Sequence, residues 1–116
     1  MTMAKNHPDY IKWIITVNDR AVERAILAIY ARQTAEEKST GETLSTNGVG
    51  FSGPDAGIGT YYAKWINSGR SLTGRHLVKA RIMALKYTRQ LCEIATERMA
   101  ADAAFAAVER EAIQAE

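Results

Sequence analysis

The most distinctive chemical feature of this sequence is a basic segment without acidic residues. Residues 56–92 contain seven lysine and arginine side chains and no aspartate or glutamate, giving a formal charge of +7. Residues 1–55 sum to −1 and residues 93–116 to −4, so the net charge of +2 conceals this segregation. Clustered cations can contact nucleic-acid phosphates, where each contact releases condensed counterions. They can equally meet an acidic protein surface, because complementary charge steers association.

Helical spacing gathers these cations on one side. On a helix that advances about 100° per residue, four of them project within roughly 80° of one another, opposite an apolar side: Arg75, Lys79, Lys86 and Arg89. Three more residues precede or adjoin this helix: Lys64, Arg70 and His76. We expect these seven residues to form a binding surface for a nucleic-acid backbone or for a protein partner. A solvated cationic face that only keeps the protein soluble is the third interpretation.

Catalytic and metal chemistry find little support in the residue types. His7, His76 and Cys92 are too few for a structural zinc site, which needs about four ligands. Cys92 lies in an apolar helical context beside an acid, which favours packing over nucleophilic catalysis. Residues 39–53 are rich in Gly, Ser and Thr, but they lack the Gly-Lys-Ser/Thr ending of a P-loop. We therefore expect no enzyme, no catalytic residue, no metal and no cofactor.

Apolar periodicity and turn signals predict that helices position the basic residues. We expect helices over residues 8–16, 19–38 and 54–68, although the β-branched run at 14–17 would also suit a strand. Residues 54–92 have the order helix, short turn, helix, which is compatible with a helix-turn-helix-like pair. The fold class predicted is therefore all-α: a compact bundle of four to five helices.

The final helical region begins after Thr73 and has apolar residues every seven positions as far as Ile113. One unbroken helix of this length would span about 60 Å. We expect either a break near residues 97–102 or a projecting alanine-rich end that pairs with a partner helix, which would give a homodimer. The domain organisation predicted is a helical core over 1–96 and an acidic C-terminal helix over 97–116 that is not a separate domain.

Aromatic side chains and the central loop are expected to serve the core. Helical spacing favours buried positions over base stacking for Trp13, Tyr61, Tyr62 and Trp65. In the loop, we expect Val49 and Phe51 to pin the chain onto the core, while Gly48 and Gly50 allow it to turn.

Composition also bears on localisation. A single cysteine forms no intramolecular disulfide, so no oxidising compartment is implied. No apolar stretch approaches 18 residues, and the N-terminal segment lacks the features of a signal peptide. We expect a cytoplasmic protein without a membrane partner.

Several motifs occur in order along residues 18–95: Arg32-Gln33-Thr34-Ala35-Glu36-Glu37, Asn47-Gly48-Val49-Gly50-Phe51 with Asp55-Ala56, Gly69-Arg70-Ser71-Leu72-Thr73, and Lys86-Tyr87 with Gln90-Leu91. Together they resemble a helical module of small phage and plasmid proteins that is similar to segments accompanying helicase-like proteins of mobile elements. Those relatives have Pro-Lys-Gln where this chain has Gly74-Arg75-His76. The resemblance implies a bacterial host cell and supplies no catalytic residues.

Two functions follow as expectations. The first is a non-enzymatic nucleic-acid-binding accessory protein of a phage or mobile element, contacting DNA or RNA phosphates through the basic helix face. The alternative is a protein-binding inhibitor or adaptor of a host nucleic-acid machine, meeting an acidic surface of a host complex. Inhibitors of host defence, such as anti-CRISPR proteins, are also small helical proteins of mobile elements.

Overall fold

The computed structural model describes the backbone of residues 3–40 and 50–114, and the side chains of residues 3–35 and 50–112. The helices are α1 (Pro8–Val17), α2 (Asp19–Thr40), α3 (Gly53–Asn67), α4 (Gly74–Leu85) and α5 (Thr88–Gln114). No strand occurs in the described backbone, so the all-α prediction is confirmed and the strand alternative over residues 14–17 is wrong. Val49 and Gly48 lie outside the described residues.

Local signals explain where several helices begin and end. Pro8 stands in the first turn of α1, where its missing N–H costs nothing. The amide of Ala21 donates a hydrogen bond of 3.0 Å to Asn18 Oδ1, which caps the exposed N–H groups of α2. Gly69 follows the end of α3 with φ +92°, a left-handed conformation that glycine adopts without strain.

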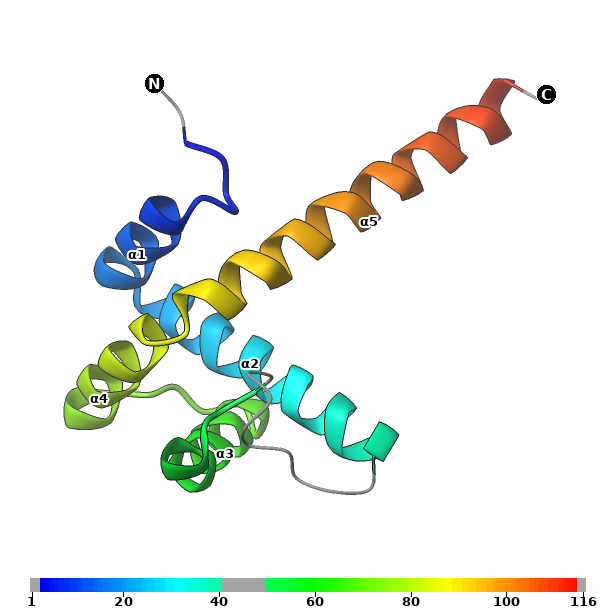
Figure 1. Cartoon of the computed structure of the whole chain (residues 1–116). Coiled ribbons are helices and arrows are strands. Elements are labelled where there is room, and N and C mark those ends of the chain that lie inside the picture. The colour runs from blue at the N-terminus through cyan, green and yellow to red at the C-terminus, as the bar shows by residue number, and fades with distance from the viewer. Residues whose placement is uncertain (1–2, 41–49, 115–116) are drawn as a thin grey trace.

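The α2 helix is the centre of the bundle, and each of the other helices packs against it (Figure 1). Its side chains Val22, Ile26 and Ile29 are fully buried. Ala25 and Ala28 of α2 are also buried, and the remaining core residues come from all four other helices and from the segments between them, which contribute Phe51, Leu72 and Tyr87. The core therefore surrounds one helix, and the outer helices are placed by what they bury against it.

The chain from residue 74 onward is two helices, not one. The helix breaks at Lys86 and Tyr87, whose amides bond to carbonyls three residues back, at 3.0 Å each, instead of four. Thr88 Oγ1 donates to the Leu85 carbonyl at 2.8 Å, which gives this carbonyl a hydrogen-bond donor where the helix is interrupted. The break expected near residues 97–102 is wrong, because α5 runs through that region without interruption. The prediction that Arg75, Lys79, Lys86 and Arg89 share one side of a single helix is therefore also wrong.

The second half of α5 projects from the bundle (Figure 1). Side chains from residue 96 to residue 112 are all exposed, whereas those of Leu91 and Ile94 are buried. The radius of gyration is 16.2 Å, against about 13 Å for a compact chain of this length. The expectation of a projecting alanine-rich end is confirmed.

A short segment, residues 50–55, is tied into the bundle before α3 begins. Gln90 forms two hydrogen bonds with the backbone of Gly50: the Gly50 amide donates to Oε1 and Nε2 donates to the Gly50 carbonyl, both at 2.9 Å. The amide of Phe51 donates to Gln33 Oε1 at 3.3 Å. Because these groups are buried, each of these hydrogen bonds replaces one that the group would make to water in the unfolded chain. We call residues 50–55 the docked segment.

Close packing holds the docked segment on its other side. Gly50 has φ +80°, and a Cβ there would lie 2.5 Å from Gln33 Cβ. The ring of Phe51 meets Tyr87 edge-on, with centroids 5.7 Å apart. Its other neighbour is Gly59 of α3, where a Cβ would lie 2.6 Å from the ring. The expectation that Phe51 pins this part of the chain onto the core is confirmed.

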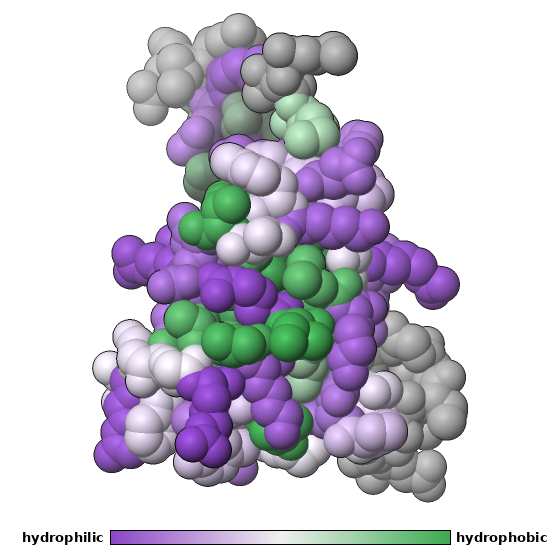
Figure 2. Space-filling model, turned by 90° about the vertical axis from the view of Figure 1, so that its left-hand side faces the viewer, coloured by the Kyte–Doolittle hydropathy of each residue, from purple (hydrophilic) through white to green (hydrophobic). Residues whose placement is uncertain are grey.

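One face of the bundle, formed by α1 and α4, exposes apolar side chains. Val17, Val78 and Ile82 are each more than half exposed. Figure 2 looks onto this side and shows apolar side chains in a band across its middle, with hydrophilic side chains around it. Val78 and Ile82 are four residues apart on α4, so they share its outer side with Arg75 and Lys79. We call Val17, Val78 and Ile82 the apolar band.

Two glycines of α3 should respond oppositely to the same substitution. A Cβ at Gly57 meets nothing within 4 Å, so Gly57→Ala should raise the free energy of unfolding by about 0.5–1 kcal/mol through helix propensity. Gly59→Ala would press on the buried Phe51 ring and should lower it by about 1–3 kcal/mol. Urea denaturation measures both changes. A Gly59→Ala protein as stable as the wild type would contradict the packing of Phe51.

Candidate functional site

Five of the seven residues expected to bind lie on the turn between α3 and α4 or on the helix ends next to it. Residues 68–73 connect the two helices, and the side chains around this turn are mostly exposed. On α3, Tyr61 and Lys64 lie on the exposed side with Trp65, at helical spacings of three and four. We call the surface made by the following side chains the α3–α4 corner: Tyr61, Lys64, Trp65, Arg70, Arg75, His76 and Lys79.

Trp65 holds the turn in place. Its indole N–H donates to the Ser71 carbonyl at 3.1 Å, and the Arg70 guanidinium carbon lies 4.4 Å from the centre of its ring system. A guanidinium in this position is attracted to the π face. The Leu72 amide donates to Glu23 Oε2 of α2 at 2.8 Å, and the Leu72 side chain is buried. The turn is therefore fixed by contacts to both α3 and α2.

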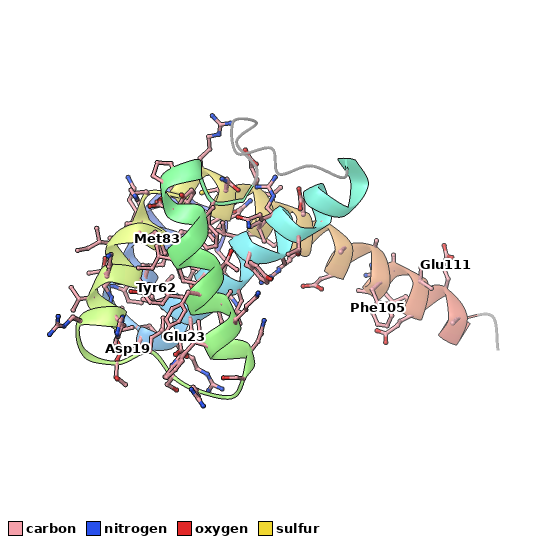
Figure 3. The ribbon with its side chains drawn as sticks, turned by 90° about the horizontal axis from the view of Figure 1, so that it is seen from below. Asp19, Glu23, Tyr62, Met83, Phe105 and Glu111 are labelled. Atoms are coloured by element: carbon pink, nitrogen blue, oxygen red, sulfur yellow. The ribbon has the colours of Figure 1, made fainter. Side chains whose placement is uncertain are left out.

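Tyr62 connects the corner to the core. Its side chain is buried and points between α3 and α4 (Figure 3). Its hydroxyl lies 3.2 Å from His76 Nδ1, within hydrogen-bonding distance, and the two rings meet edge-on. Burial, and secondarily the neighbouring Tyr61, raise the pKa of Tyr62 above its usual value, so the hydroxyl stays protonated. His76 is thus held on α4 by a partner on α3.

The aromatic residues do not all serve the core, which corrects the expectation from the sequence. Tyr62 is buried and Trp65 is half-buried, but Tyr61 is 56% exposed and Trp13 is 53% exposed. Tyr61 and Tyr62 are adjacent, so they point about 100° apart on the helix, and only one of them can face α4. Tyr61 instead stacks on Trp65, with centroids 6.3 Å apart and planes at 25°.

The cations of the corner are available for a ligand. Lys64, Arg75 and Lys79 are exposed, and they form no ion pair with an acidic side chain among residues 3–35 and 50–112. Arg75 stands in the first turn of α4, which contains no acidic residue. The positive end of the helix dipole therefore adds to the field of these side chains.

The two other expected residues, Lys86 and Arg89, do not belong to this corner. Lys86 follows α4 at the helix break, and its Nζ lies 2.8 Å from Asp55 Oδ2. Arg89 lies in the first turn of α5 and pairs with Glu93 at 3.5 Å. Both side chains are more than half exposed, but each already has a carboxylate partner. The four cations expected to form one stripe are therefore not equivalent: Arg75 and Lys79 lie on α4 without a carboxylate partner among the described residues, whereas Lys86 and Arg89 each have one.

Lys86 belongs to a polar cluster around the docked segment. The Tyr87 hydroxyl donates to Asp55 Oδ2 at 2.6 Å and accepts from the Ser52 amide at 2.9 Å. Burial raises the pKa of Asp55, but the hydrogen bonds from Lys86 and Tyr87 lower it by more than burial raises it, so the pKa lies below its usual value of 3.8. The hydrogen bond to Asp55 raises the pKa of Lys86. This carboxylate therefore holds its charge and retains Lys86.

Another arginine of the basic segment, Arg81, is structural. Its Nε donates to the Ile15 carbonyl near the end of α1 at 2.8 Å, and its guanidinium pairs with Asp19 at the start of α2. It thereby satisfies a carbonyl that α1 leaves without an intrahelical partner. Sequence reasoning missed this role, because Ile15 lies 66 residues away along the chain.

The described residues show few signs of other sites. They contain no group of three or more His, Cys, Asp or Glu side chains placed to hold a metal. Burial raises the pKa of the half-buried Cys92 thiol, as expected for a packing role. No helix in the described ranges has the length and apolar character needed to cross a membrane. An open groove of about 330 Å³ lies between α1, α2 and α5, with Ile14, Ala28 and Met99 among its lining residues.

The Asp55 cluster predicts a specific dependence of stability on pH. Because the pKa of Asp55 is lower in the folded than in the unfolded chain, its contribution to the free energy of unfolding is fully present above 3.8 and is lost as the pH falls toward the folded pKa. Asp55→Asn should therefore destabilise the protein at neutral pH, with a deficit that shrinks below pH 3.8. Urea denaturation of both proteins across this range measures the difference. Tyr87→Phe, which removes the hydrogen bonds of the Tyr87 hydroxyl to Asp55 and Ser52 but keeps the carboxylate, should weaken the pH dependence. A deficit independent of pH would contradict the cluster.

Comparison with known proteins assigns no family to the chain. No family model matches it, and neither a curated protein nor a solved structure shows significant similarity to it. The function is therefore inferred from the geometry and charge of the α3–α4 corner.

Proposed function

We propose that the protein is a non-enzymatic nucleic-acid-binding protein whose α3–α4 corner contacts the sugar-phosphate backbone. Lys64, Arg70, Arg75 and Lys79 supply the positive charges, and His76 lies among them. Phosphate contacts of this kind give affinity that falls steeply with salt. The phage or mobile-element setting rests on the sequence resemblance alone.

The observation that carries this proposal is the coincidence of exposed cations and aromatic rings on one ordered surface. The cations of the corner have no acidic partner in the described residues, and the Tyr61 ring and the Arg70 guanidinium both stack on Trp65. Arginine and aromatic side chains together are typical of surfaces that bind nucleic acids. A cationic face that serves only solubility does not need an ordered turn at its centre.

The contact set is smaller than the sequence suggested. Lys86 and Arg89 are already paired with Asp55 and Glu93, so releasing either cation for a phosphate would break an existing interaction. We therefore place them outside the primary contacts. Since the corner offers few side chains that could read base edges, backbone recognition is favoured over sequence readout.

The second candidate is a protein-binding inhibitor or adaptor that meets an acidic surface of a host complex. The apolar band favours it, because Val78 and Ile82 share the outer side of α4 with Arg75 and Lys79 at helical spacing. Basic side chains around exposed apolar ones fit an acidic amphipathic partner better than a phosphate backbone.

Nucleic-acid binding should depend on the position of the cations as well as on their number. The variant Arg70→Gln/Arg75→Gln/Lys79→Gln removes three charges from the corner. The matched control Lys5→Gln/Arg24→Gln/Arg98→Gln removes three from the groove between α1, α2 and α5. Fluorescence anisotropy with labelled DNA and RNA oligonucleotides, in single- and double-stranded form, should give affinity for the wild type that falls steeply with salt. The slope of log affinity against log salt should shrink by about two to three in the corner variant.

Three results would contradict the proposal or change it. Equal losses in the two variants would show that net charge, not the corner, drives binding. Affinity that does not change with salt would exclude phosphate contacts. Absence of binding at low salt would overturn the proposal in favour of the protein partner.

We also propose that the projecting end of α5, residues 97–112, forms a homodimer. Ala101, Phe105, Val108 and Ala112 recur at spacings of three and four and share one side of this helix. Phe105 and Val108 are 65% and 62% exposed, and Phe105 lies far from the body of the bundle (Figure 3). A second copy would cover these side chains by helix pairing.

Acidic residues flank this apolar side, so the dimer has an unusual salt dependence. On the helix, Asp102 and Glu109 lie on one flank together with Arg98, and Glu97 and Glu111 lie on the other, so the residues that border the apolar side are mainly acidic. Two copies would bring like charges together, and salt screens that repulsion. Sedimentation equilibrium should therefore show dimerisation that strengthens as salt rises. Phe105→Glu should abolish it, whereas Ala103→Glu, on the opposite side, should not. A monomer at all concentrations and salts would refute the dimer.

A further inference from the structure

We infer that the α3–α4 corner binds unpaired bases, with Tyr61 as the ring on which a base stacks, so that the preferred ligand is a single-stranded nucleic acid. The inference rests on the proposed function and adds the ligand class. The inference rests on the exposed and stacked position of Tyr61, because a surface that bound phosphates through cations alone would not need an exposed aromatic ring.

Tyr61 is an exposed aromatic residue on a side of α3 that packing does not require. Its side chain is 56% exposed, although its neighbour Tyr62 fills the interface with α4. One side of its ring is backed by Trp65 at a near-parallel angle of 25°. Every base has a π face, so a ring backed in this way can accept any base without hydrogen-bond readout.

The stacked rings of Tyr61 and Trp65, which we call the platform, are held in position in the absence of a ligand. Trp65 is fixed by its hydrogen bond to the Ser71 carbonyl and by the guanidinium of Arg70 on its ring. The turn that carries these groups is anchored through Leu72 to Glu23 of α2. Because little side-chain freedom remains to be lost, stacking on this surface costs less ordering entropy than on a mobile side chain.

The neighbouring cavity is too small to take a base inside the protein. It has a volume of about 60 Å³ and is bounded by residues of α3, the turn and α4, including Tyr61, Thr73 and His76. This space admits a few water molecules. A base must therefore lie on the outer face of Tyr61, where Lys64, three residues along the same exposed side, can meet the adjoining phosphate.

A duplex cannot use this platform without being opened. Its bases are already stacked and present only their edges in the grooves. Unpaired bases present their faces, which aromatic side chains bind. The cations can meet the phosphates of either form, so stacking is the contribution that distinguishes a single strand from a duplex.

Two substitutions at Tyr61 and one matched control test the inference. Tyr61→Leu removes the ring, and Tyr61→Trp keeps a stacking surface. Trp13→Leu removes an aromatic residue of similar exposure on α1, outside the corner. The probes are a fluorescent oligothymidylate strand and a duplex of the same length, titrated at one low salt concentration. Circular dichroism checks that each variant is folded.

Tyr61→Leu should weaken binding of the single strand by about 5- to 100-fold and change duplex binding by less than twofold. Tyr61→Trp and Trp13→Leu should both bind the single strand like the wild type. The single strand should also quench tryptophan fluorescence in a Trp13→Phe protein, where Trp65 is the reporter.

Each other outcome has a defined meaning. Salt-dependent binding that Tyr61→Leu leaves unchanged, or reduces equally for both probes, would overturn the stacking inference while the proposed function stands. A loss in Trp13→Leu as large as in Tyr61→Leu would overturn it as well. If neither probe binds the wild type, both the inference and the proposed function fail.

Discussion

The docking of residues 50–55 onto the bundle is the constraint on which the rest of the structure depends. Gln90 holds the Gly50 backbone, Phe51 fills a space that Gly59 leaves open, and Asp55 receives the Tyr87 hydroxyl. These contacts determine where α3 begins, and they favour the helix break at Tyr87, whose hydroxyl they engage. Each buried polar group left without its partner would cost about 1–3 kcal/mol.

Contacts with other parts of the chain divide the cations of the basic segment into those with a carboxylate partner and those without one among the described residues. Lys86 is drawn to Asp55, and Arg81 ties the end of α1 to the start of α2. The cations that remain without a carboxylate among the described residues lie before and within α4, around the turn that Trp65 orders. A segment with a formal charge of +7 thus presents a much smaller exposed surface, and that surface has a defined shape. The charge distribution along the sequence identifies the basic segment, and the ion pairs of the fold distinguish its partnered cations from those of the α3–α4 corner.

The sequence predicts the parts of this arrangement that depend on near neighbours. Asn18, Pro8 and Gly69 mark helix ends through local hydrogen bonds and backbone conformation, and the corner residues are recognisable because they are close in the chain. The break at residue 87 is not predictable in this way, because Tyr87 and Asp55 are 32 positions apart. The seven-residue repeat crosses the break without marking the core, since Val78 and Met99 are exposed and Leu85 and Cys92 are only half-buried. The exposure of Tyr61 likewise depends on which of two adjacent tyrosines meets α4.

The two surfaces proposed here lie at opposite ends of the molecule, which determines how they can cooperate. In both ribbon views the projecting end of α5 points away from α3 and α4 (Figures 1 and 3), so the acidic helix does not cover the basic corner. A dimer formed by the two projecting ends would leave both corners open and carry them on one particle. Binding of the second corner to the same strand would then be intramolecular, and it would raise the apparent affinity without any new contact. Salt weakens the corner contacts and strengthens the helix pairing, so affinity for a long strand should fall less steeply with salt than affinity for a strand that spans one corner.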